Sequence, residues 1–109
     1  MATEPVFAKR LKQARLRVGL SQKQLGILAG IDEFSASPRI NQYERGKHTP
    51  DFGTAERLAS ALDVPVAFLY CRDGRLAKLL LCWETLSRGD RADLLRQVEA
   101  ALSKSSVKG

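Results

Sequence analysis

The spacing of apolar residues along the chain predicts an all-α protein. In residues 3–18, Phe7, Leu11, Ala14 and Val18 recur at intervals of three and four, which places them on one face of a helix. The same period recurs in later segments, and the sequence lacks the apolar–polar alternation of a half-buried strand. We therefore expect helices at about residues 3–18, 21–29, 37–45, 52–62, 66–70 and 76–86, with a seventh around residues 94–102.

Cap residues mark the limits of the first two helices. Thr3 is the expected cap of the first helix, and Gly19 provides the left-handed residue that ends it. Ser21 then begins the second helix, and Gln24, three positions later, completes a capping box. The expected buried stripe of this short helix consists of Leu25, Leu28 and Ala29.

The third helix has a clear end at Gly46, but its start has two solutions. Residues 31–36 have the composition of a turn, so Ser37 and Pro38 are the expected N-cap and first helical residue. The alternative places Ser35 at the cap, with Pro38 still in the first turn.

The two faces of the third helix differ in chemistry. At about 100° per residue, Ile40, Tyr43 and Glu44 share one face, which leaves Gln42 and Arg45 on the opposite face. Amide and guanidinium groups can bind base edges in the major groove of DNA, glutamine at adenine and arginine at guanine. Periodicity alone fits an ordinary solvated helix face equally well.

Glu44 falls on the buried face of this helix, where a carboxylate needs a cationic partner. Arg15, on the first helix, is the expected partner. The alternative is that the Glu44 side chain reaches past the edge of the core into water.

Charge favours nucleic acid as the partner, and composition excludes several other classes. The net charge is +6, and residues 1–50 carry nine basic and four acidic side chains, as expected of a surface that meets phosphates. The sequence contains no apolar run of the roughly 18–20 residues that span a membrane, and no signal peptide. A single histidine and two cysteines without metal-ligand spacing argue against an enzyme, a metal site or a cofactor, and favour a reducing cytoplasm.

Helix-capping residues, glycines that end helices and a Tyr-Glu pair occur together after the first helix. They run Leu20-Ser21-Gln22-x-x-Leu25-x-x-x-Ala29-Gly30-Ile31, and then Ile40-Asn41-Gln42-Tyr43-Glu44-Arg45-Gly46 with Pro50. This combination resembles the helix-turn-helix of the XRE (Cro/lambda-repressor-like) regulators, over about residues 7–70. The resemblance implies a five-helix lambda-repressor-like domain that binds double-stranded DNA sequence-specifically, usually as a homodimer on a two-fold-symmetric operator.

The resemblance also implies roles for single residues. The residues expected to contact DNA are Ser21, Gln22, Ser35, Ser37, Arg39, Asn41, Gln42, Arg45 and Lys47. Within this set, Gln22 is expected at a phosphate, Arg39 and Gln42 are the foremost base-contact candidates, and Arg45 and Lys47 are expected on the DNA backbone. Arg15 and Glu44 are expected to form the internal ion pair.

The chain departs from the family pattern between its second and third helices. Gly30 and Ile40 are ten positions apart, roughly four more than the pattern has, so we expect an enlarged turn. The extra residues include the acidic Asp32 and Glu33, and Phe34 is expected to pin the turn to the body of the domain.

The last third of the chain lies outside the resemblance. The sixth helix is apolar over most of its circumference, so it needs two neighbours. We expect residues 1–72 to form the DNA-binding domain, residues 73–103 a helical hairpin that builds a two-fold dimer, and residues 104–109 a disordered tail. The expected dimer interface consists of Leu76, Leu80 and Trp83. A self-contained seven-helix monomer is the alternative.

These observations predict a cytoplasmic transcriptional regulator, specifically a repressor that binds a palindromic operator as a homodimer. The alternative function is the antitoxin of a toxin–antitoxin pair, in which the C-terminal helices bind a protein partner, the toxin.

Overall fold

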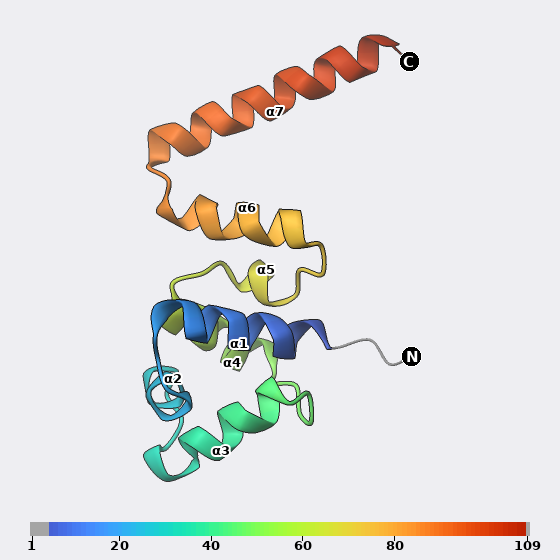
Figure 1. The fold of residues 1–109 in the computed structure, drawn as a ribbon. Helices are drawn as coiled ribbons and strands as arrows, with labels where there is room; N and C mark the ends of the chain where they lie inside the picture. The colour runs from blue at the N-terminus through green and yellow to red at the C-terminus, as the bar shows by residue number, and fades with distance from the viewer. Residues whose placement is uncertain (1–4, 109) are drawn as a thin grey trace.

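The computed structural model describes residues 5–108, and all regular structure in this range is helical (Figure 1). The helices are α1 (Val6–Val18), α2 (Gln22–Leu28), α3 (Glu33–Glu44), α4 (Phe52–Leu62), α5 (Val66–Leu69), α6 (Gly74–Thr85) and α7 (Arg88–Lys108). The predicted all-α fold, with five helices followed by two more, is confirmed. None of these helices is long and apolar enough to cross a membrane.

Helices α1 to α5 share one hydrophobic core, to which each contributes a side chain that is fully buried. These side chains are Leu11, Leu25, Ile40, Leu58 and Phe68, one from each helix in order. Burial of a large apolar side chain contributes about 1.5–3 kcal/mol. Because every helix of this body makes such a contribution, none of them can leave without exposing the core.

The local signals at the ends of α1 and α2 act largely as predicted. Gly19 is left-handed (φ 77°), and Ser21 and Gln24 form the complete capping box. Helix α1 begins at Val6, later than predicted, while the predicted cap Thr3 lies outside the described residues. Leu28 was expected to be buried, but its side chain is 62% exposed because the short α2 turns only Leu25 and Gly26 toward the core.

The start of α3 differs from both sequence-based solutions. Asp32 is the N-cap, and its side chain accepts a hydrogen bond from the Phe34 N–H at 3.0 Å. Ser37 and Pro38 therefore lie inside the helix, and the turn predicted over residues 31–36 is wrong from Glu33 onward. At 3.6 residues per turn, the roughly four additional residues lengthen α3 by about one turn at its N-terminus.

The last two helices extend away from this body. Helix α6 buries Ala77 against the core, whereas α7 turns away from α6 and runs beyond the rest of the molecule (Figure 1). The radius of gyration is 16.7 Å, against about 13 Å for a compact domain of this length. The Arg91 guanidinium holds the α6–α7 turn by donating to the Trp83 carbonyl at 2.9 Å and lying 5.4 Å from the Trp83 ring centroid.

Residues 104–108 are drawn as helix in the structure, in a range for which the sequence predicted a disordered tail (104–109). Helix α7 continues to Lys108, and Gly109 lies outside the described residues. The sequence contains no helix-breaking residue between Arg91 and Lys108, so each added residue extends the helix by one further hydrogen bond.

Candidate nucleic-acid interface

Helices α2 and α3 pack unusually closely, and a glycine makes this possible. A Cβ atom placed on Gly26 would lie 2.6 Å from the Ala36 Cβ and 2.9 Å from the Ala36 Cα. No side chain fits at position 26 unless one of the two helices moves. Gly26 was not predicted from the sequence to have a role, although a glycine inside a predicted helix is a known sign of close packing.

An ion pair fixes α3 against α1. The Arg15 Nε lies 2.5 Å from the Glu44 Oε2, and the Arg15 Nη2 donates to the Glu44 Oε1 at 3.0 Å. The side chains are 11% and 3% exposed, respectively, and the hydrogen bonds to Glu44 raise the pKa of Arg15. The Arg15 Nη1 also donates to the Leu20 carbonyl at 3.0 Å, so this one guanidinium joins the end of α1 to the end of α3. The structure thus places Arg15 and Glu44 together as predicted.

Gln22 joins α2 to the same network. Its Nε2 donates to the Asn41 Oδ1 and to the Glu44 Oε1, each at 3.2 Å. Both amide hydrogens of Gln22 are therefore used inside the protein. The amide oxygen that remains is a hydrogen-bond acceptor, so it cannot donate to a phosphate. In this conformation the side chain of Gln22 positions Asn41, and only the backbone N–H of Gln22 is free to meet a phosphate.

The outward face of α3 is a stripe of four residues, Phe34, Pro38, Asn41 and Arg45, spaced four, three and four apart. The opposite face carries Ala36, Ile40 and Tyr43 and is buried in the core.

The other predicted contact residues lie beside this outward stripe. Arg39 and Gln42 are exposed, and Ser35 and Ser37 are partly buried at its edges. The side chains of Arg39, Gln42 and Arg45 make no hydrogen bond to any residue that the structure describes, so they are available to a ligand.

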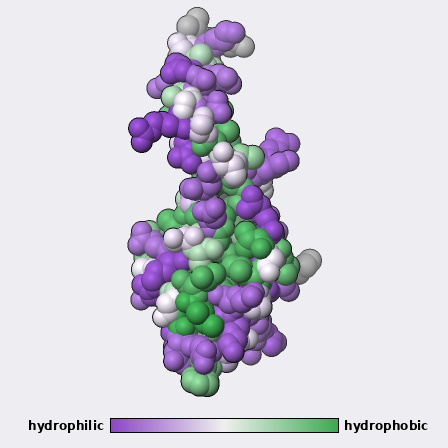
Figure 2. Space-filling view, turned by 90° about the vertical axis from the view of Figure 1, so that its left-hand side faces the viewer, coloured by the Kyte–Doolittle hydropathy of each residue, from purple (hydrophilic) through white to green (hydrophobic). Residues whose placement is uncertain are grey.

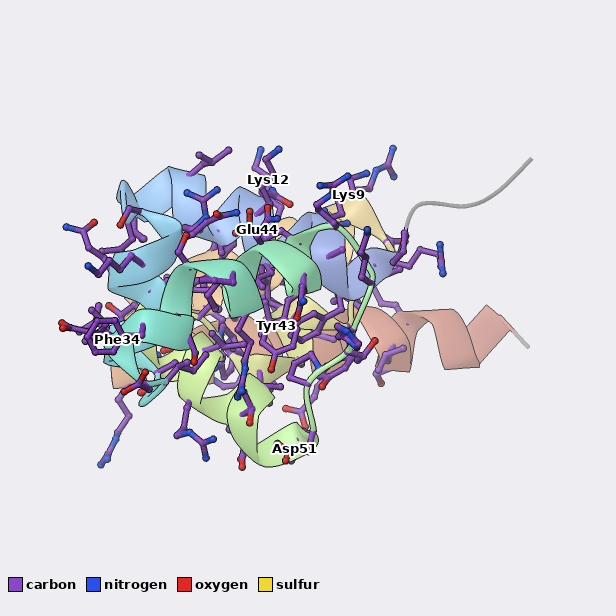
Figure 3. All side chains as sticks on the ribbon, turned by 90° about the horizontal axis from the view of Figure 1, so that it is seen from below. Lys9, Lys12, Phe34, Tyr43, Glu44 and Asp51 are labelled. Carbon is purple, nitrogen blue, oxygen red and sulfur yellow. The ribbon has the colours of Figure 1, made fainter. Side chains whose placement is uncertain are left out.

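Phe34 was expected to pin the turn to the body of the domain, but it does not. Its side chain is 85% exposed and lies at the outer edge of the domain (Figure 3). The cause is the earlier start of α3, because Asp32 caps the helix and places Phe34 in its first turn, four residues before Pro38 on the outward face.

Positive charge borders α3 on two sides. Lys47 is exposed in the loop after α3. On the α1 side, Lys9 and Lys12 line an open hollow of about 310 Å³ that reaches Glu44 (Figure 3). Neither lysine was singled out from the sequence, and only the structure shows that both lie near α3.

The predicted dimer-interface residues lie on α6. Leu76 is exposed, and Leu80 and Trp83 are partly buried. The two cysteines differ, because Cys71 is buried while Cys82 is exposed on this helix. Within the described residues no group of three or more potential metal-binding side chains comes together.

Comparisons with known proteins agree with this geometry. The helix-turn-helix family model HTH_3 matches residues 11–69, which cover α2 and α3 and most of the body. The chain is similar to a solved structure described as the transcriptional regulator BswR, with 50% identity and a TM-score of 0.84 over 89% of this chain and 96% of that chain. A search of curated proteins found no match.

Proposed function

The chain belongs to the helix-turn-helix family of DNA-binding transcriptional regulators, and from this premise we propose that it is a repressor that binds a palindromic operator as a homodimer. The observation that carries the proposal is that the side chains of Arg39, Gln42 and Arg45 are exposed on α3 and at its C-terminal end without hydrogen-bond partners in the described chain. In this class of domain, such a helix enters the major groove and reads base edges.

The proposed contacts divide into bases and phosphates. Gln42 and Arg39 would bind base edges, with Asn41 donating through the amide that Gln22 leaves free. Arg45 and Lys47 would bind phosphates near the end of α3. Proposed smaller contributions come from the hydroxyl groups of Ser21, Ser35 and Ser37 and from the backbone N–H of Gln22.

We also propose different roles for the two parts of the chain. Residues 1–72 would bind DNA, and residues 73–103 would form the dimer through Leu76, Leu80 and Trp83. Support comes from apolar side chains that α6 and α7 leave exposed: Leu76, Leu79, Leu95, Val98 and Leu102. A two-fold dimer would place two α3 helices about 34–36 Å apart, one helical turn of DNA.

The test of DNA readout is selection of bound sequences from a random pool of duplex DNA. We expect a palindromic site, with affinity that falls steeply as salt rises because several phosphates are neutralised together. Gln42→Ala should weaken the selected site about 5- to 150-fold and relax specificity at one base pair of each half-site. Gln97→Ala removes a matched exposed amide from α7 and should leave the base preference unchanged.

The test of assembly is light scattering at micromolar concentration, with and without the selected DNA. A dimer in both is expected. A monomer in both would contradict the homodimer, and it would leave the exposed apolar residues of α7 to a different protein, as in the antitoxin alternative. A pool from which no sequence is enriched would contradict sequence-specific binding itself.

A further inference from the structure

Phe34 is exposed at a position where an apolar side chain gains nothing from the rest of the protein. It is the second residue of α3, and it is 85% exposed, with its side chain at the outer edge of the domain (Figure 3). Its backbone N–H is held by the Asp32 side chain at 3.0 Å, so the local cap determines where the helix presents the ring. A phenylalanine presented in this way offers a large apolar area to a ligand.

Pro38 extends this apolar surface along α3. It is exposed and lies four residues after Phe34 on the same face, followed by Asn41. A proline inside a helix lacks the N–H for the bond to residue i−4, which normally destabilises the helix. In α3 that bond would have ended on the carbonyl of Phe34. The outward face thus begins with two adjacent apolar residues and becomes polar only from Asn41 onward.

Charge indicates which part of a DNA duplex this end of α3 can approach. The carboxylates of Asp32 and Glu33 adjoin Phe34, and they would be repelled by phosphates. Arg45, at the opposite end of the stripe, suits a phosphate. The N-terminal end of α3 is therefore suited to the interior of the major groove, where the N-terminal residues of a recognition helix meet base edges.

From this placement we propose that Phe34, assisted by Pro38, recognises thymine through its C5-methyl group. That methyl is the apolar feature of the major groove, and apolar side chains including phenylalanine contact it. The roughly one additional turn at the start of α3 is what brings Phe34 to this position. The proposal rests on the proposed function, because it assigns one base preference to the helix that reads the operator.

The experiment replaces thymine by deoxyuridine, which differs by the methyl group alone, at each thymine of the selected operator in turn. Binding is measured for the parent protein, for Phe34→Ala and for Phe52→Ala. Phe52 is a matched control, because it is another exposed phenylalanine in the first turn of a helix capped by aspartate, here Asp51 on α4.

For the parent and for Phe52→Ala, we expect deoxyuridine at one thymine of each half-site to weaken binding about fourfold per methyl group. For Phe34→Ala, the thymine and deoxyuridine sites should bind equally, at the weakened level. If the parent binds both sites equally, or if Phe34→Ala still prefers thymine, the inference is overturned. If Phe34→Ala loses affinity although the parent binds thymine and deoxyuridine sites equally, the inference is also overturned, and a wedge between base pairs is indicated instead.

Failure of this inference and failure of the proposed function give different results. If the random pool yields an enriched operator but no thymine shows a methyl effect, only the role of Phe34 is wrong. If the pool yields no enriched sequence, the operator-binding function is wrong and the role of Phe34 falls with it. Circular dichroism of the Phe34→Ala protein should match the parent, because the ring makes few contacts within the domain.

Discussion

The body of five helices and the last helix, α7, differ in whether they bury large apolar side chains in the core. Every helix of the body contributes a side chain that is completely buried, whereas Leu95, Val98 and Leu102 of α7 are exposed. Figure 2 shows the extension as a narrow column above the broader body, with apolar and polar surface mixed along it. The body is therefore stabilised by contacts within the chain, while α7 gains little from them. The same substitution should have different effects in the two regions.

The largest difference is expected from truncating a buried side chain. Phe68 of α5 is completely buried, and Phe68→Ala should lower the free energy of unfolding by about 3–5 kcal/mol, because the loss of apolar burial adds to the cost of the cavity. Urea titration followed by circular dichroism measures this change.

Leu102→Ala is the matched substitution in the extension. The Leu102 side chain is 63% exposed, so its removal should change the free energy of unfolding by less than about 0.5 kcal/mol in dilute protein. A loss as large as that of Phe68→Ala would show that α7 packs against the body in solution, contrary to the comparison. If the proposed dimer uses α7, Leu102→Ala should weaken dimerisation and leave the fold of the protomer intact.

Sequence reasoning succeeded where a single local signal determined the structure. Gly19 and the Ser21–Gln24 capping box each allow one arrangement of the backbone, and both occur as predicted. At the start of α3 the chain offers three competing caps, Asp32, Ser35 and Ser37, which local chemistry cannot rank. The choice is consistent with the tight packing of Ala36 on Gly26, a contact between helices that periodicity does not reveal.

The candidate site likewise contains one contact that could be predicted from the sequence and other features that could not. The Arg15–Glu44 pair could be predicted, because a buried carboxylate needs a cation and Arg15 was the candidate on the facing helix. The bond from Gln22 to Asn41 could not, because it depends on the distance between α2 and α3. The exposure of Phe34 was missed for a related reason, since its direction follows from where the helix begins.

A second contrast compares the buried ion pair of the body with the exposed pair of α7. Glu44→Ala leaves Arg15 without its carboxylate in a site that is nearly closed to water, so it should lower the free energy of unfolding by about 3 kcal/mol. Asp93 pairs with Arg96 on α7, where both side chains are more than half exposed. Asp93→Ala should therefore change stability by no more than about 1 kcal/mol.

Reversing the charges tests whether the buried pair itself is responsible. Arg15→Glu and Glu44→Arg should each destabilise the protein strongly, and the double variant should recover part of the loss. A double variant that recovers nothing would mean that the bonds from Arg15 to Leu20 and from Gln22 to Glu44, which the exchange does not restore, matter more than the ion pair.

The smallest contrast is between two glycines. Gly26→Ala would gain at most about 1 kcal/mol from helix propensity, but the new Cβ would lie within 3 Å of both the Cβ and the Cα of Ala36. A backbone atom cannot rotate away, so α2 and α3 must separate, at a cost of about 1–3 kcal/mol. Gly74→Ala adds the same methyl group at the start of α6, where nothing lies within 4 Å, and should be neutral or slightly stabilising.

Because separation of α2 from α3 would also strain the bond from Gln22 to Asn41, Gly26→Ala should lose operator affinity as well as thermal stability, while Gly74→Ala keeps both. If Gly26→Ala were as stable as Gly74→Ala and still bound DNA fully, the close packing of α2 on α3 would not be what positions the outward face of α3.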